Sequence, residues 1–432
     1  MILKSYIDLY RSAQDRFNAG APDWLVEARR GSLDFLQQHG SLREAAAYAT
    51  DYGMNPDRLQ LKEDPYKLFS CAIPEISAYN YLVVNDSFCI PGAAELPQGV
   101  VVTSLAKAFS THPEWVKRYF GLSHTDSADW HFNQLFAQDG LFIYVPQGVV
   151  LDQPVQLVNY MYDKEARMAV SHNLIVVEDG AAAQVLVCDH AWGETDYLSN
   201  RYTEVYVGKG AKYEHYKLES TNEHMTNIST LAIDQQAGSQ VLTNSITLHG
   251  GHTDNRVQVR MLGEGARLSL NGLALGTGRQ RISNHTDIRH QVAGAMSSEL
   301  FKYLLDQAAQ GDFYGLIRVD EGADRTTALQ TNRNLCLSAD ARMQARPQLE
   351  IYADDVQCNH GSATGQLDEN ALFYMQTRGI SEVEARHLLM SAFAYEVLNN
   401  IGIEKVKDRL RLMIDRRLRG EKYNCHACSM CQ

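Results

Sequence analysis

The chain has 432 residues, with 40 Lys and Arg against 52 Asp and Glu, and a formal net charge of −12. This acidic balance argues against a general nucleic-acid binder, which usually shows a basic excess or a concentrated basic face. No stretch approaches the roughly 18 apolar residues of a membrane span, and Asp8 and Arg11 interrupt the start before any long apolar run. We therefore expect no membrane segment and no signal or transit peptide, and predict a soluble, cytoplasmic protein.

Helical periodicity dominates residues 1–50, where Tyr6, Tyr10 and Phe17 fall on one face and a similar spacing recurs from Trp24 to Leu36. Prolines and a glycine interrupt the pattern before residue 75, and residues that favour strands follow. We predict an N-terminal helical domain over residues 1–75. Shorter helical patterns return around residues 103–119 and 129–137.

A repeat then becomes visible. Glycines next to an alanine recur at intervals of 30, 28, 27, 29 and 28 residues, at Gly180, Gly210, Gly238, Gly265, Gly294 and Gly322. Each interval holds segments that alternate apolar and polar residues, as strands do. A period of this length is typical of a solenoid, and the spacing is too short for the four strands of a β-propeller blade, the competing architecture. The sequence predicts a β-helix core over residues 76–366.

After Asp368 the period is helical again. Ser381 and Glu384 have the spacing of a capping box, and residues 403–418 form a further helical pattern with a charged face. We predict a C-terminal helical domain over residues 367–422. Its last part carries eight basic residues: Lys405, Lys407, Arg409, Arg411, Arg416, Arg417, Arg419 and Lys422. A solvated face is the default explanation for them, and a docking surface for an acidic protein partner is the alternative.

The chain has eight cysteines, which are scattered through a large protein without a secretory signal, so a disulfide framework is not expected. The tail, residues 423–432, places Cys425, Cys428 and Cys431 at three-residue intervals. Three thiolates at this spacing can wrap a soft metal or the edge of an iron-sulfur cluster. A frayed, redox-active chain end is the competing explanation.

The stretch from Leu349 to His360 alternates apolar and polar residues, which suits one β-strand. Residues two apart on a strand face the same side, so Cys358 and His360 would lie together, with Cα atoms about 6 to 7 Å apart. A thiolate and an imidazole at that separation can share one metal ion. A packed thiol beside a hydrogen-bonded histidine is the alternative. The sequence contains no phosphate-binding loop, dinucleotide fingerprint, nucleophile elbow or zinc-binding helix motif, so no catalytic residue is assigned.

The segment Pro347 to Asp368, with Phe373 to Ile380 behind it and Gln330 to Leu335 ahead of it, resembles the SufD branch of the SufB/SufD family of iron-sulfur cluster assembly scaffold proteins. The resemblance covers nearly the whole chain. Residues 361–365, Gly-Ser-Ala-Thr-Gly, depart from the family's more frequent Gly-Ala-Thr-x-Gly, although His360 and Gly365 keep their places.

The resemblance implies a right-handed parallel β-helix flanked by helical domains, and a non-catalytic subunit of a SufBCD-type complex. It implies pairing with a SufB-like paralogue through the β-helix, and docking of a SufC-like ABC ATPase on the C-terminal helices. A transient iron-sulfur cluster would form between the paralogues, with His360 as a ligand for iron or the cluster and Cys358 supporting it. Two other functions stay open: a metalloenzyme with an interfacial metal site, and a solenoid that binds only proteins, as a homodimer through its last coil.

Overall fold

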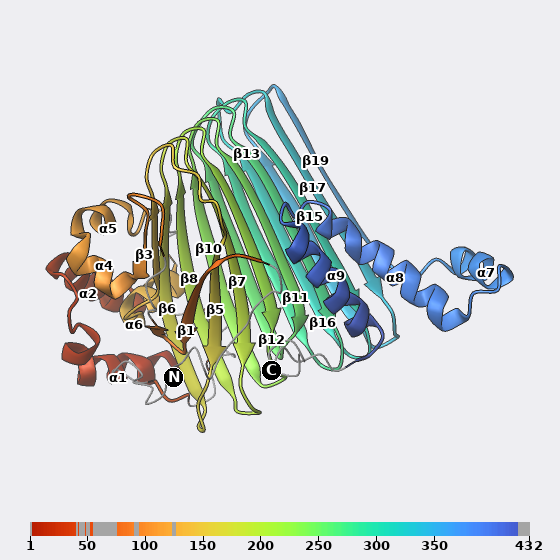
Figure 1. Ribbon diagram of the computed structural model, residues 1–432, viewed down its shortest axis with the longest axis horizontal. Helices are drawn as coiled ribbons and strands as arrows, with labels where there is room; N and C mark the ends of the chain where they lie inside the picture. Colours follow the sequence, from red (N-terminus) through yellow and green to blue (C-terminus); the bar gives the residue numbers. More distant parts are fainter. Residues whose placement is uncertain are drawn as a thin grey trace.

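Two long sheets form a parallel β-solenoid in the computed structural model, which describes residues 2–39, 42, 48, 52–54, 76–89, 95–122 and 127–421. The strands of the first sheet are, in spatial order, β2 (Ser87–Cys89), β1 (Tyr79–Val84), β5 (Val155–Met161), β7 (Ala182–Ala191), β9 (Lys212–Ser220), β11 (Gln240–His249), β13 (Arg267–Gly276), β15 (Met296–Leu305), β17 (Thr326–Cys336) and β19 (Val356–Gly365). The strands of the second are β3 (Val101–Ser104), β4 (Leu141–Val145), β6 (Arg167–Val177), β8 (Tyr197–Val207), β10 (Met225–Gln235), β12 (His252–Met261), β14 (Arg281–His290), β16 (Gln310–Val319) and β18 (Arg342–Ile351). From β4 onward the chain alternates between the sheets, and Figure 1 shows the resulting stack of coils.

The glycine of each repeat turns the chain at a corner of the solenoid. Gly180, Gly210, Gly238, Gly265, Gly294 and Gly322 all have φ between +65° and +77°. Glycine adopts this left-handed conformation without the steric penalty of a Cβ. The residue after each glycine is at most 1% exposed: Ala181, Ala211, Ser239, Ala266, Ala295 and Ala323. The corner therefore needs a glycine followed by a small side chain, which explains the repeat seen in the sequence.

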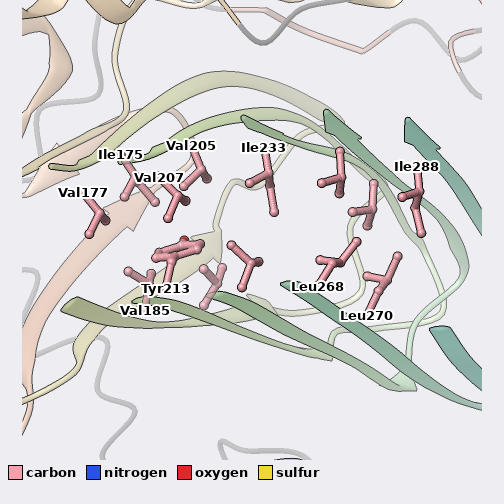
Figure 2. Close-up of a cluster of buried hydrophobic side chains, with 14 of the residues drawn as sticks. Ile175, Val177, Val185, Val205, Val207, Tyr213, Ile233, Leu268, Leu270 and Ile288 are labelled. Atoms are coloured by element: carbon pink, nitrogen blue, oxygen red, sulfur yellow. The ribbon is translucent and has the colours of Figure 1, made fainter. Parts of the chain in front are cut away.

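The side chains inside the coils form one long apolar core. Figure 2 shows Val205 and Val207 of one sheet opposite Val185 and Tyr213 of the other, all completely buried. They reach the interior because alternate residues of a strand face the same side. Such stacked β-branched and aromatic side chains account for the pairing of strands about 30 residues apart in sequence.

The interior also contains buried charges that the sequence pattern did not indicate. Arg201 Nη1 lies 2.6 Å from Asp189 Oδ1, and Lys217 Nζ lies 3.4 Å from Glu219 Oε2. These side chains are at most 10% exposed. Buried charges need partners to offset their desolvation, and this cluster supplies them.

Helices cover the outer faces of both sheets. The N-terminal set consists of α1 (Ile2–Phe17), α2 (Asp23–His39), α4 (Leu105–Thr111), α5 (Pro113–Tyr119) and α6 (Ala128–Phe136). Their aromatic side chains pack on the second sheet, as Tyr6 and Phe132 do against Met168 and Leu198. The C-terminal set consists of α7 (Glu369–Thr377), α8 (Glu382–Leu398) and α9 (Glu404–Leu418), and α8 and α9 pack on the first sheet. Within the described ranges, no helix is both long and apolar enough to cross a membrane.

The parallel solenoid with helices at both ends confirms the predicted fold class. The Ser381 half of the capping box is confirmed, because Ser381 Oγ accepts a hydrogen bond from the backbone N–H of Glu384 at 3.3 Å. The Glu384 carboxylate pairs with Arg419. One prediction is wrong: the stretch from Leu349 to His360 is not one strand. The first sheet's β19 begins at Val356, after a corner at residues 352–355 that ends β18 of the second sheet. The inward side changes across this corner from odd residue numbers, as at Met343 and Leu349, to even ones, as at Val356 and Cys358. The consecutive Asp354 and Asp355 mark the break in the alternation.

Candidate functional site

The last coil of the solenoid has an open edge. Within the described part of the chain, β18 pairs only with β16 and β19 pairs only with β17, so each ten-residue strand has one free side. Figure 1 shows β19 at the end of the stack, away from the N-terminal helices. Unpaired backbone N–H and C=O groups along such an edge favour pairing with another chain. The end is therefore a candidate interaction surface.

Cys358 and His360 both lie on β19 and face the inside of the coil. The parallel register places Cys358 beside Ala328 of β17 and His360 beside Gln330. Ala328 and Gln330 are 0% and 2% exposed, which shows that this side of β17 faces the interior. His360 is exposed since no described coil lies beyond it, whereas Cys358 is half-buried against the apolar core. The same-side placement expected from the two-residue spacing is confirmed, and the role of the pair as ligands stays a prediction.

The environment of Cys358 favours the neutral thiol. Burial raises the pKa of the Cys358 thiol, and a hydrogen bond with the backbone of Ala328 opposes this shift only in part. Metal ligation requires the thiolate. Binding of iron by Cys358 would therefore release a proton, whereas a neutral His360 imidazole can bind directly.

A buried polar ladder lies beneath His360. Glu299, Gln330 and His360 occupy adjacent register positions on β15, β17 and β19. Gln330 Nε2 donates a hydrogen bond to Glu299 Oε2 at 2.7 Å, which leaves Gln330 Oε1 buried with no partner among the described residues. Because the amide nitrogen is committed to Glu299, this oxygen is an uncommitted acceptor on the residue paired in register with His360. The ladder can thus position the histidine and select its tautomer.

Two further observations describe the surroundings of Glu299 and Gln330. Burial raises the pKa of Glu299, which is 1% exposed, to about 7. A Cβ on Gly315 of β16 would lie 2.3 Å from Gln330 Nε2, so glycine at this position leaves the space that the amide occupies. Sequence reasoning did not assign Glu299 or Gln330. The available signal was the polar alternation Gln330, Asn332, Asn334 on a strand whose inward side should be apolar.

Asparagines fix the rest of β19 against β17. Asn332 Oδ1 accepts hydrogen bonds from Ser362 Oγ at 3.2 Å and from Asn334 Nδ2 at 2.6 Å, and Asn334 Nδ2 also donates to Thr364 Oγ1 at 3.1 Å. Gln330, Asn332, His360 and Ser362 line one surface hollow of about 360 Å³. The hollow is wide enough for a group larger than a single ion, and His360 lies in its wall.

The protein supplies only part of a metal site in this region. Across the residues that the structure describes, no cluster of three or more His, Cys, Asp and Glu side chains could hold a metal ion. An iron ion or cluster at His360 would need further donors from outside these residues. The predicted ligands Cys425, Cys428 and Cys431 lie outside the described residues.

Comparisons with known proteins identify the family. Residues 160–393 match the family described as "SUF system FeS cluster assembly, SufBD core domain", and residues 1–157 match "SufBD protein N-terminal region". The chain belongs to the SufBD family. The core match alone spans more than half of the 432 residues.

Three relatives illustrate the similarity. The SufBD family protein slr0076 of Synechocystis is 28% identical over 352 residues, which cover 78% of each chain. Protein ABCI7, chloroplastic, of Arabidopsis thaliana is 28% identical over 74% of this chain and 69% of its own length. The iron-sulfur cluster assembly protein SufD of Escherichia coli is 27% identical over 67% of this chain and 69% of its own.

The C-terminal helices of this SufBD protein present an exposed apolar surface. Phe373 and Tyr374 of α7 are 69% and 58% exposed, and Val383 at the start of α8 is 78% exposed. Figure 1 shows α7 projecting beyond the solenoid. Large exposed apolar side chains that gather in one region mark interaction surfaces.

The basic face of α9 is largely neutralised by nearby acidic side chains. Lys407 pairs with Glu404 at 3.3 Å, and Arg419 pairs with Glu384 at 3.2 Å. Arg411 also lies 3.5 Å from an acidic residue one turn earlier. These contacts favour the solvated-face explanation for most of the basic residues; Lys422 lies outside the described residues.

Proposed function

We propose that this SufBD protein is a non-catalytic, cytoplasmic scaffold subunit for iron-sulfur cluster assembly. It pairs through the open edge of β18 and β19 with a SufB-like paralogue, and it presents His360, supported by Cys358, to iron or a nascent cluster at that junction. The cluster is cargo that passes through the complex. The observation that carries the proposal is a histidine in register with a buried polar ladder at a sheet edge that no described strand pairs, where a second subunit can supply the remaining ligands.

The edge is suited to a specific partner. Its inward side combines the half-buried apolar residues Met343, Leu349 and Val356 with the polar hollow around His360. A second solenoid end would extend the core of this one and exclude water from it. The complementary strand edge supplies backbone hydrogen bonds, while His360 and its polar neighbours add specificity.

The test of the site is His360→Ala in the complex purified anaerobically with its paralogue and ATPase. We expect bound iron and sulfide to fall at least about tenfold, since a ligand is lost while the strand remains. Gln357→Ala, on the other face of the same strand and outside the hollow, is the matched control and should keep normal cluster content. Normal content in the His360 variant would remove this residue from the mechanism.

Pairing through the edge can be tested separately. Met343→Lys places a charge on the inward side of β18 and should abolish association with the paralogue in native mass spectrometry, because the charge would be buried without a partner. Gln344→Lys, on the outward side, should leave association intact. If the Met343 variant folds and still associates, the pairing surface lies elsewhere. A stable homodimer lost in the same variant would instead favour the purely protein-binding solenoid.

We further propose that the C-terminal helical region, residues 367–422, docks the SufC-like ABC ATPase. The support is the exposed apolar group on α7 and the start of α8. Phe373→Asp should weaken co-purification with the ATPase at least about tenfold, because large exposed aromatics are frequent hot spots. Glu369→Asn, an exposed polar change on the same helix, should leave it unchanged. Retention of the ATPase after deletion of residues 367–422 would refute docking in this region.

A further inference from the structure

A second cavity, of about 610 Å³, lies under the C-terminal end of α9 and is separate from the hollow at His360. Its walls are the successive turns where strands of the first sheet end and strands of the second begin, at residues 223–226, 249–252, 275–281 and 304–307. Arg417 and Leu418 of α9 and Gly420 also line it, together with Leu337 and Met390. Neither Cys358 nor His360 contributes to it. The volume falls in the range of small-molecule sites, roughly 300 to 1,000 Å³.

The guanidinium of Arg417 enters this cavity wall among neutral groups. Its Nη2 donates to Thr277 Oγ1 at 2.7 Å, to Gln280 Oε1 at 3.1 Å and to His249 Nδ1 at 3.4 Å. Its Nε is buried and has no hydrogen-bond partner among the described residues. Burial lowers the pKa of Arg417 and Glu223 opposes this shift through space, but a guanidinium stays protonated at neutral pH. The wall of the cavity therefore contains the positive charge of Arg417, whose Nε–H donor has no partner among the described residues.

The other charges of the lining do not neutralise this cation through contact. Arg279 and Arg281 also line the cavity, and within the described ranges none of the three arginines forms an ion pair with a carboxylate. The acidic lining residues are Glu223 and Asp306. Most other arginines near the solenoid surface do have acidic partners, as Arg289 has in Asp287 at 3.0 Å. The cavity thus gathers three arginines that have no carboxylate partner among the described residues.

A buried amide provides an independent indication of a ligand. Gln280 is 5% exposed, and its Oε1 accepts from the backbone N–H of Thr277 at 2.9 Å as well as from Arg417. Its Nε2 is buried in the lining without a partner in the part of the chain that the structure describes. A buried donor left unsatisfied is costly, at about 1 to 3 kcal/mol, so a side chain that keeps one usually has a missing partner. Gln280 Nε2 and Arg417 Nε are both donors, so each of them lacks a hydrogen-bond acceptor.

We propose that this cavity binds a small anion that carries a phosphate or carboxylate group. Such a group offers several acceptor oxygens, which match the unused Nε donor of Arg417 and the Nε2 donor of Gln280. Arginine binds oxyanions strongly because its planar fork makes charge-assisted hydrogen bonds, and partial burial strengthens them. Binding would also link the end of α9 to the turns of the solenoid that line the cavity, so the ligand would stabilise the attachment of the C-terminal helices.

The test is isothermal titration of the full chain with inorganic phosphate, pyrophosphate and citrate, which separate phosphate from carboxylate recognition. We expect saturable binding of at least one probe with a Kd below about 1 mM. Arg417→Gln should weaken it at least about tenfold, because the charged donor is lost. Arg411→Gln, on the same helix but outside the cavity, should not change the affinity.

Arg417 also anchors α9, so its variant could fail to fold. Arg279→Gln provides the second test, since Arg279 is exposed in its turn and can be replaced without disturbing the core. We expect it to weaken binding about two- to fivefold through the lost charge. The proposal is overturned if none of the three probes binds saturably to the wild-type chain. The proposal is equally overturned if binding survives unchanged in Arg279→Gln and in any folded Arg417→Gln. It is also overturned if Arg417→Gln lowers the melting temperature while no probe raises the melting temperature of the wild type, because Arg417 would then be a structural anchor only.

Discussion

Replacing Glu299 by glutamine should change how the stability of the protein depends on pH. The side chain is 1% exposed, and burial raises its pKa from 4.5 to about 7. Between these two pH values the folded state holds a proton that the unfolded state has released. The free energy of unfolding therefore falls as the pH rises through this window, and it does not depend on the titration of Glu299 below pH 4.5 or above pH 7.

The magnitude follows from the gap between the two pKa values. A gap of about 2.5 pH units at about 1.4 kcal/mol per unit corresponds to about 3 kcal/mol. The amide that Glu299→Gln introduces is neutral at all pH values and can still accept the hydrogen bond of Gln330. The stability of Glu299→Gln relative to wild type should therefore rise by about 3 kcal/mol between about pH 4.5 and about pH 8. Other titrating groups cancel in this comparison.

Urea unfolding of both proteins at several pH values measures the effect. Because a solenoid can unfold in stages, hydrogen exchange of amides in β15 and β17 should accompany it. Glu264→Gln is the control, since Glu264 is an exposed residue paired with Arg325. The reasoning is refuted if wild type and Glu299→Gln show the same pH dependence, because Glu299 would then titrate as it does in water.

Three further changes probe other parts of the fold. Gly272→Ala should destabilise the protein by about 1 to 3 kcal/mol in urea unfolding, because the new Cβ would lie 2.2 Å from the ring of Phe301. Glu396→Ala should loosen α8, measured by limited proteolysis, at a cost of about 1 to 2 kcal/mol, because it leaves the 2%-exposed Lys302 ammonium without its acidic partner. Alkylation of Cys358 by iodoacetamide, followed by mass spectrometry, should be slow at about pH 7 and accelerate above pH 9, because burial raises the thiol's pKa above its ordinary value of 9.0.

Each of these has a matched comparison. Gly361→Ala should be nearly neutral, since a Cβ there meets nothing within 4 Å, and equal losses at both glycines would contradict the clash. Glu404→Ala removes an exposed surface pair and should not expose α8 to protease. A Cys358 reaction rate at neutral pH equal to that of a free thiol would show that the thiol is not shielded.

The candidate site shows what periodicity can and cannot reveal. The two-residue spacing of Cys358 and His360 predicts their common side, because that relation is local to one strand. The corner at residues 352–355 was missed, although the consecutive Asp354 and Asp355 interrupt the alternation and shift its phase by one residue. Glu299 and Gln330 could not be connected to His360 from the sequence, because each lies about 30 residues from the next and only the register of the sheet aligns them.

The sequence by itself determined the solenoid. Each corner requires a left-handed glycine and a small buried residue, and these local steric demands recur every coil, so the repeat is visible without tertiary information. The Ser381 N-cap of α8 is local in the same sense. Only the tertiary structure decided which polar side chains are stacked beneath His360, and that Arg417, one of several basic residues on α9, enters a cavity instead of solvent. Burial and register depend on contacts between distant segments, and they turn ordinary glutamate, glutamine and arginine residues into parts of a site.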